Sequence, residues 1–330
     1  MDNLESKTDE LLIDNIINKL YQVKDFDKLS KVCSDYVNEI MISDEGYRLF
    51  FTGLKHYSEK NINYAIELYE KAVNLGNSHA IVKLANCYKR GEVVKKDIND
   101  AISLYKKAVN LGNSDAMYNL AICYKNGHGV EKDINCAIEL YKKAANLGNS
   151  LAMVNLANCY KEGHGVEKDI NHTISLYEKA VNLDNSLAMV NLAICYQNGK
   201  EIKKDINKTI SLYEKAVNLG NSSAMNNLAN CYKKGHGVKK DINYAIELYE
   251  KAIKLDCNNK IFHKNLQLLI KGYPSEYFQY CQFKYNNLEN EYTNLKKEYK
   301  EIKDNLIDYA PGTDKAKKLE TEFYHNADKI

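Results

Sequence analysis

A repeat with a fixed period of 36 residues dominates this chain. The triplet Asp-Ile-Asn starts 36 residues after the previous one each time, at Asp97, Asp133, Asp169, Asp205 and Asp241. A Cys-Tyr pair recurs at the same interval, starting at Cys87, Cys123, Cys159, Cys195 and Cys231. A fixed period between about 20 and 50 residues is typical of an open array, in which each unit covers the apolar face of its neighbour. The period therefore constrains the architecture strongly and the function only weakly.

The composition excludes several classes of function. The 330 residues are 45% hydrophobic and 27% charged, which is ordinary for a globular chain. Forty-six basic and 44 acidic residues leave a net charge of +2, so no overall field favours nucleic acid. No apolar run approaches the ~18–20 residues that cross a bilayer, and the first residues do not resemble a secretory signal. We therefore expect a cytoplasmic protein with neither a nucleic-acid nor a membrane partner.

Each repeat encodes two helices with a short turn between them. In the unit that starts at Ser114, Asn113 and Ser114 are placed to cap the first helix, Gly127 to end it, and Asp133 to cap the second helix. The apolar residues recur at helical spacing. They are Ala116, Leu120 and Tyr124 in the first helix, and Ile134, Ala137, Ile138, Tyr141, Ala144 and Ala145 in the second.

This repeat resembles the Sel1-like repeat, a relative of the tetratricopeptide repeat, over about residues 45–272. The matching residues are Ala116, Leu120, Tyr124, Gly127, Gly129, Val130, Asp133, Ala137, Tyr141, Lys143, Ala144, Ala145 and Gly148. The chain departs from the family pattern at Ala121, where glycine is usual, and at Leu140, where an aromatic residue often stands. Neither departure threatens the fold.

The resemblance implies an all-α fold, a right-handed α-solenoid of about six 36-residue helix–turn–helix repeats. We expect residues 1–44 to form an N-terminal helical cap, with a separate recognition element as the alternative. Residues 45–272 form the solenoid, including a closing helix after Asp256. Residues 276–309 are predicted to form a coiled coil, and residues 310–330 a C-terminal tail without an assigned function.

The coiled-coil prediction rests on two sets of apolar residues spaced seven apart. These are Phe278, Tyr285, Tyr292, Tyr299 and Leu306 at a positions, and Cys281, Leu288, Leu295, Ile302 and Tyr309 at d positions. In a parallel dimer, opposite charges would meet in the pairs Lys284–Glu289, Glu291–Lys296 and Glu298–Lys303. These pairs favour a parallel homodimer through residues 278–309. The tyrosines at a positions weigh against tight packing, so a single helix folded back on the array is the alternative.

The repeated cysteines and histidines do not form a chemical site. Equivalent positions in stacked helical repeats lie roughly 9–10 Å apart, whereas a disulfide needs Cα atoms within about 7 Å. We therefore predict buried, reduced thiols. The Gly-His-Gly loops at His128, His164 and His236 are whole repeats apart and cannot converge on one zinc ion. We expect no metal, no cofactor and no catalytic group.

The first helices of a solenoid are expected to line its concave side. Helix geometry gives a set of groove residues: Val82, Asn86, Lys89, Tyr118, Asn119, Ile122, Lys125, Val154, Asn158, Lys161, Asn226, Asn230 and Lys233. The fifth repeat has Val190, Ile194 and Gln197 at the equivalent places. The last position of each set, at 89, 125, 161, 197 and 233, is lysine in four of the five repeats. This recurrence predicts a positive stripe that binds an acidic segment or a C-terminal carboxylate. The alternative is that these lysines and asparagines only solvate an exposed face.

The leading prediction for the function is a non-enzymatic adaptor or scaffold for protein–protein interaction, with a partner segment in the concave groove. The resemblance also suggests a regulatory accessory subunit of an enzyme or of a degradation complex. An enzyme with an overlooked site is a third class, for which the sequence offers no constellation of residues.

Overall fold

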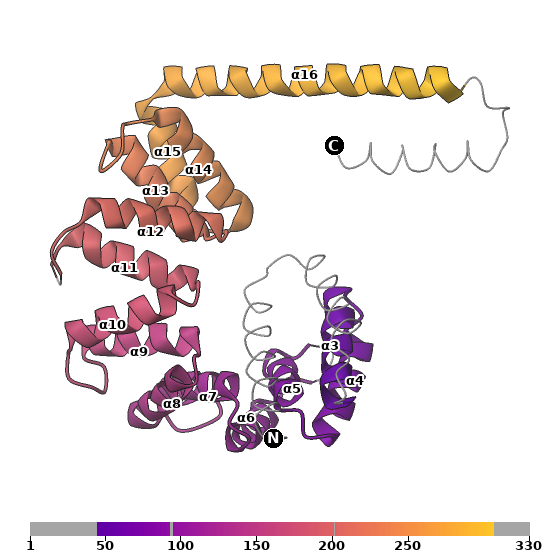
Figure 1. The fold of residues 1–330 in the computed structure, drawn as a ribbon, viewed down its shortest axis with the longest axis vertical. Helices are drawn as coiled ribbons and strands as arrows, with labels where there is room; N and C mark the ends of the chain where they lie inside the picture. The colour runs from indigo at the N-terminus through magenta and orange to yellow at the C-terminus, as the bar shows by residue number, and fades with distance from the viewer. Residues whose placement is uncertain (1–44, 93–94, 201, 307–330) are drawn as a thin grey trace, which may run out of the picture. The chain divides into compact units, whose positions relative to one another are not determined.

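The computed structural model describes residues 45–92, 95–200 and 202–306, and within these ranges it is built from α-helices without a β-strand (Figure 1). The predicted N-terminal cap (1–44) and tail (310–330) lie outside the described residues. The helices are α3 (Glu45–Ser58), α4 (Ile62–Asn74), α5 (Ser78–Arg90), α6 (Ile98–Asn110), α7 (Ser114–Asn126), α8 (Ile134–Asn146), α9 (Ser150–Glu162), α10 (Ile170–Val181), α11 (Ser186–Asn198), α12 (Ile206–Asn218), α13 (Ser222–Lys234), α14 (Ile242–Leu255), α15 (Lys260–Gly272) and α16 (Pro274–Leu306).

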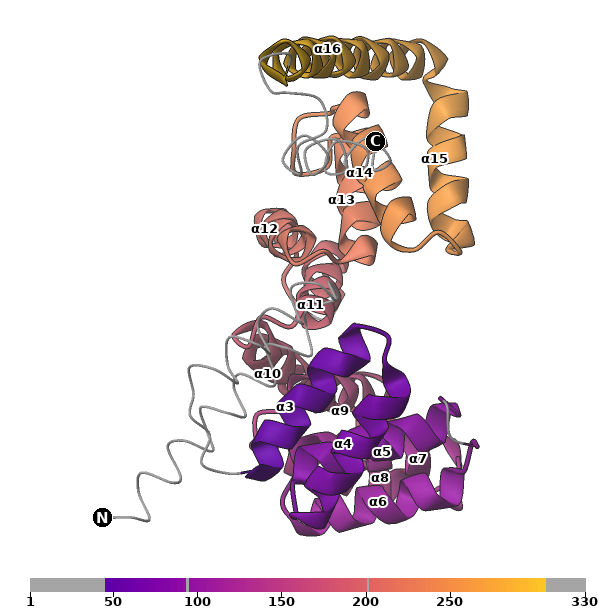
Figure 2. The same ribbon diagram turned by 90° about the vertical axis from the view of Figure 1, so that its right-hand side faces the viewer.

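The chain forms two compact units, divided after Ala216. In the first unit each helix packs on the next one along the chain, from α3 through α11 (Figures 1 and 2). In the second unit α14 packs against α13, α15 and the start of α16. Packing between sequence neighbours is the defining property of a solenoid, so the predicted all-α repeat architecture is confirmed.

Side-chain caps set the start of the repeats. The Asn113 side chain accepts a hydrogen bond from the Ala116 backbone N–H at 2.9 Å. The equivalent asparagines of four other repeats make the same contact, and they are Asn77, Asn149, Asn185 and Asn221. Asp133 likewise accepts from the Cys136 N–H at 2.9 Å at the start of α8. These contacts satisfy N–H groups that have no partner within the helix. The caps predicted at Asn113 and Asp133 are therefore confirmed, whereas Ser114 is the first residue of α7 and Asn113 alone is its N-cap.

The core of each repeat is a tyrosine surrounded by alanines. The tyrosines of the second helices are at most 1% exposed, and they are Tyr69, Tyr105, Tyr141, Tyr177, Tyr213 and Tyr249. Alanines of both helices are fully buried beside them. Small side chains allow two helices to approach, and the tyrosine ring fills the remaining volume. The five repeated cysteines are also buried free thiols, as predicted.

The Gly-His-Gly loops pack on the preceding repeat. Gly127 ends α7 in the left-handed conformation, with φ of 72°. Gly129 also has a positive φ, of 70°, and a Cβ atom there would lie 2.6 Å from Cγ1 of Ile98 on α6. Gly129 is therefore required both by the turn and by the close approach of two repeats.

The second unit ends with two helices of different character. Helix α15 is the closing helix predicted after Asp256, and it packs on α14. Helix α16 is about 50 Å long at 1.5 Å per residue. It contacts α14 and α15, and Tyr280 and Lys284 near its start bind Glu250 of α14. The predicted long C-terminal helix is thus confirmed, while its pairing with a second copy stays a prediction.

Candidate partner-binding surface

The first helices of the repeats carry the candidate groove residues. We call the side of α5, α7, α9 and α11 that holds positions 86, 122, 158 and 194 the inner face of the first unit. Helices α5 and α7 contact each other directly. Part of each first helix is therefore occupied by its neighbour, and the predicted groove residues divide into buried and accessible ones.

Three of the predicted groove residues are buried. Val82 and Val154 are each 1% exposed, because neighbouring helices cover this part of the first helix. Asn226 is 7% exposed, and its side-chain oxygen accepts a hydrogen bond of 2.8 Å from Asn265 of α15. These three positions offer a partner almost no surface.

The predicted groove asparagines are bound by the core tyrosines. Tyr105 Oη donates to Asn86 Oδ1 at 2.5 Å, and Tyr177 Oη donates to Asn158 Oδ1 at the same distance. In the second unit Tyr249 Oη donates to Asn230 Oδ1 at 2.8 Å. Each asparagine stands 19 residues before its tyrosine, so the second helix of a repeat fixes the orientation of an amide on the first helix.

The intervening repeat lacks this hydrogen bond. Ile122 occupies the position of the asparagine, and the buried hydroxyl of Tyr141 has no hydrogen-bond partner among the described residues. Its ring lies beside that of Tyr118, with 6.2 Å between the ring centroids. In the fifth repeat Ile194 also replaces asparagine, and there Tyr213 Oη donates to Gln197 Oε1 at 3.1 Å.

The alternation of asparagine and isoleucine is visible in the sequence at positions 86, 122, 158, 194 and 230. This alternation could have indicated which repeats contain the tyrosine–asparagine hydrogen bond. The tyrosine is present in every repeat, whereas the asparagine that accepts its hydrogen bond is present only in alternate repeats. The inner face therefore alternates between an oriented amide and an apolar side chain.

The lysines at the end of the first helices remain accessible. Lys89, Lys125 and Lys161 of the first unit are half-exposed, as is Lys233 of the second. Burial raises the pKa of the Cys123 thiol, and the ammonium group of Lys89 opposes that rise. Lys125 acts in the same way on the pKa of Cys159. Both ammonium groups therefore lie near a cysteine on the first helix of the following repeat.

The remaining two predicted residues lie on α7. Tyr118 is half-buried; burial raises the pKa of its hydroxyl, and a hydrogen bond with Asn155 of α9 opposes that rise. The Asn119 side chain donates to the Asp115 backbone oxygen at 2.9 Å, one turn earlier in its own helix. Tyr118 is thus part of the inner face between two repeats, whereas Asn119 is engaged by its own backbone.

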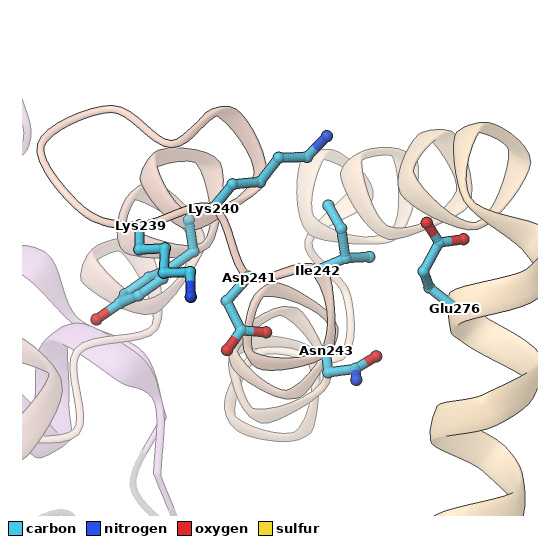
Figure 3. Close-up of a pocket in the computed structure, with 7 residues that line it drawn as sticks. Lys239, Lys240, Asp241, Ile242, Asn243 and Glu276 are labelled. Carbon is cyan, nitrogen blue, oxygen red and sulfur yellow. The ribbon is translucent and has the colours of Figure 1, made fainter.

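The loops between helices form shallow hollows rather than a site. One, in the second unit, is lined by Tyr232, Lys239, Lys240, Asp241, Ile242, Asn243 and Glu276 (Figure 3). A second, in the first unit, is lined at six positions 72 residues earlier by Tyr160, Glu167, Lys168, Asp169, Ile170 and Asn171. The same hollow occurs in two repeats because the loop is repeated. In neither hollow do the lining side chains form a recognisable catalytic or ligand-binding arrangement.

Two of the three loop histidines are exposed to solvent, and His236 is half-exposed. His128 and His164 are exposed, and His164 Nδ1 lies 3.1 Å from a carboxylate oxygen of Glu162. In the part of the chain that the structure describes, no three His, Cys, Asp or Glu side chains come together as metal ligands. None of the helices described there is both long and apolar enough to span a membrane.

The repeated helix pairs, each packed on the next, define this protein as an α-solenoid. The chain belongs to the Sel1 repeat family, whose pattern matches residues 46–77, 78–113, 114–149, 150–185, 186–221 and 222–257. Proteins of this family are generally non-catalytic scaffolds for protein–protein interaction. The predicted family membership is confirmed, and the six matched units agree with the predicted number of repeats.

Solved structures of similar proteins share the fold. The chain is 26% identical to a Sel1 repeat protein from Oxalobacter formigenes, with a TM-score of 0.58, over 67% of this chain and 96% of that one. It is 24% identical to a protective antigen of uropathogenic Escherichia coli strains that has a Sel1-like repeat (SLR) fold, with a TM-score of 0.57. That match covers 73% of this chain and 52% of the antigen. A comparison with curated proteins found no match.

Proposed function

We propose that this chain is a non-enzymatic adaptor that binds an extended, acidic segment of a partner protein along the inner face of the first unit. The observation that carries this proposal is the recurrence of a half-exposed lysine, Lys89, Lys125 and Lys161, at one position of three consecutive repeats. An anionic segment lying along the stack is attracted by all three ammonium groups. Complementary charges of this kind speed association and select the partner.

The asparagines of the inner face support the same ligand. The Oδ1 atoms of Asn86 and Asn158 are occupied by the tyrosine hydroxyls. This leaves their Nδ2 hydrogens as the groups available to a partner. Such N–H groups bind acceptors, which are the backbone carbonyls of a peptide, an acidic side chain or a C-terminal carboxylate. An amide whose oxygen is already fixed loses less conformational entropy when its nitrogen binds.

The spacing of these groups suggests the length of the bound segment. Asn86 and Asn158 are two repeats apart, which corresponds to roughly 18–20 Å at normal helix-packing distances. An extended chain covers that distance in about six residues at ~3.3 Å each. Ile122 and Tyr118 lie between the two amides and favour an apolar side chain in the middle of the segment. In the second unit, Asn230 and Lys233 offer the same chemistry, while α15 covers Asn226.

A selection from randomised peptides displayed on phage tests this proposal. We expect the intact chain to enrich segments rich in Asp and Glu, with an apolar residue near the centre. The variant Lys89→Glu/Lys125→Glu/Lys161→Glu should not enrich them. Lys107, Lys143 and Lys179 are exposed on the second helices of the same repeats, so their reversal to Glu is a control with an identical change in charge. Equal enrichment by all three proteins contradicts the proposal.

The proposal includes two further points. All cysteines in the described residues are free thiols, which supports a reducing, cytoplasmic setting. A second copy of the chain is also proposed as a partner through the C-terminal helix, which would bring two inner faces into one assembly and raise its avidity for a partner with repeated segments.

A further inference from the structure

An apolar seam runs along α16 and is not covered by any described residue. Its members are Phe278, Cys281, Tyr285, Leu288, Tyr292 and Leu295, and all six are exposed. The exposed fractions of the five large side chains range from 42% at Leu295 to 68% at Tyr292. Helices in proteins are stabilised mainly by packing of an apolar face, and contiguous exposed apolar surface marks an interaction site.

The start of α16 is fixed to the second unit, whereas the rest of the helix extends away from α14 and α15 (Figure 1). Tyr280 is buried, and its hydroxyl donates to Glu250 Oε2 of α14 at 2.8 Å. Lys284 Nζ lies 2.5 Å from the same carboxylate oxygen. Every side chain described from Tyr285 onward is exposed. The seam is therefore anchored at its base by contacts with Glu250, and beyond that base the described residues leave it uncovered.

We infer that the seam from Tyr285 onward binds the same seam of a second copy, forming a parallel, in-register two-stranded coiled coil. The charges beside the seam select this occupant. In a parallel pair, Glu291 faces Lys296 of the second copy and Glu298 faces Lys303, so both flanking contacts are attractive.

The same charges disfavour the antiparallel arrangement. If Tyr292 packs against Leu295 of an antiparallel copy, Glu291 faces Glu298 of that copy twice along one edge of the seam. Like charges set opposite each other at an interface are unfavourable. This repulsion offsets the attraction between Glu289 and Lys296 on the other edge, whereas the parallel pair has attraction on both edges. The chain thus specifies the orientation as well as the partner.

One of the three flanking pairs predicted from the sequence is altered by the fold. Lys284 was expected to meet Glu289 of the second copy, but in this structure it is bound to Glu250 of its own chain. Two of the three predicted pairs remain for the dimer. The pairing therefore begins at Tyr285, after the anchored turns, and Lys284 holds the base of the coiled coil in place of an inter-chain contact.

The mass of the full chain in solution tests this inference independently of the inner face. We expect twice the 37.8 kDa of one chain by light scattering, and a single-chain mass for Leu288→Glu/Leu295→Glu. Asn290 and Lys297 lie on the opposite side of the helix, so Asn290→Glu/Lys297→Glu should stay dimeric. Circular dichroism confirms that each variant is folded. A single-chain mass for the unmodified protein overturns the inference, as does a dimer that survives the two leucine substitutions.

Charge reversal then tests the orientation. Glu291→Lys/Glu298→Lys should weaken the dimer, and adding Lys296→Glu/Lys303→Glu should restore it. In an antiparallel dimer the same four substitutions would set like charges opposite each other on both edges of the seam, so restoration would fail.

A disulfide provides a second test of the orientation. Oxidation of Leu295→Cys in a Cys257→Ser/Cys281→Ser background should link two chains, because equivalent d positions meet in a parallel pair. Asn290→Cys in the same background should not link them. Failure of both the charge restoration and the link overturns the parallel arrangement.

Discussion

The hydroxyl of Tyr177 donates a hydrogen bond of 2.5 Å to the side-chain oxygen of Asn158, joining the buried centre of one helix pair to its inner face. Tyr141 is the equivalent tyrosine one repeat earlier, and there Ile122 occupies the position of the asparagine. The hydroxyl of Tyr141 has no hydrogen-bond partner among the described residues. Two tyrosines with nearly the same burial thus differ in the hydrogen bonding of their hydroxyls. This difference separates the structural role of the tyrosine ring from the role of its hydroxyl.

Removing the two hydroxyls should have opposite consequences. Tyr177→Phe loses a hydrogen bond, which should lower the free energy of unfolding by about 1 kcal/mol. Tyr141→Phe removes a buried hydroxyl that lacks a partner, so it should be neutral or stabilise the chain by up to about 1 kcal/mol. Urea unfolding followed by circular dichroism measures both changes. Equal destabilisation by the two substitutions would show that the hydroxyl of Tyr141 is satisfied.

Two glycines with the same backbone conformation should differ in their tolerance of alanine. Gly112 has φ of 78°, and a Cβ atom added there would have no neighbouring atom within 4 Å, while a Cβ at Gly129 would lie 2.6 Å from Ile98. Gly112→Ala should cost about 1–2 kcal/mol for the left-handed conformation alone. Gly129→Ala should cost roughly 1–3 kcal/mol more, because two repeats must separate. Thermal unfolding of the two variants measures the difference, and equal losses would contradict tight contact between the repeats.

Stability should fall in alkaline solution. Burial raises the pKa of the Cys87 thiol from 9.0 to about 11, and it also raises the pKa of the core hydroxyls of Tyr105 and Tyr249. The unfolded chain therefore loses these protons at a lower pH than the folded chain, which favours unfolding as the pH rises. The contribution of Cys87 is fully present below about pH 9 and is lost between about pH 9 and 11.

The midpoint of urea unfolding, measured at intervals across that range, checks this dependence. Cys87→Ala should show a shallower decline than the unmodified chain, since its thiol no longer titrates. A midpoint that stays constant or rises above about pH 9 would contradict the burial of ionisable groups in the core.

The repeats could be predicted from the sequence because their signals are local. Asn113 and Asp133 cap helices within three residues of themselves, and Gly127 ends a helix through its own backbone. The hydrogen bond between Tyr105 and Asn86 is different, because it joins residues 19 apart on two helices. Helix periodicity gives the face of a residue but does not identify which neighbour covers it.

The groove residues show the same limit. Helix geometry placed Val82 and Asn226 on the groove side, but tertiary packing buries both. For Asn226 the cause is α15, whose Asn265 lies against it. The closing helix was predicted from the sequence, yet the surface that it covers depends on the angle at which it returns. Lysines are less affected, because their long side chains reach solvent from a packed helix.

The affinity for an acidic peptide, measured by fluorescence anisotropy as the salt concentration is raised, tests the central claim most directly. A peptide selected by the intact chain should bind it more weakly at each higher salt concentration, because screening reduces attraction by Lys89, Lys125 and Lys161. Lys107→Glu/Lys143→Glu/Lys179→Glu should behave like the intact chain, and Lys89→Glu/Lys125→Glu/Lys161→Glu should lose binding at every concentration. Binding that is independent of salt, or equal in the two variants, would contradict recognition of an acidic segment on the inner face.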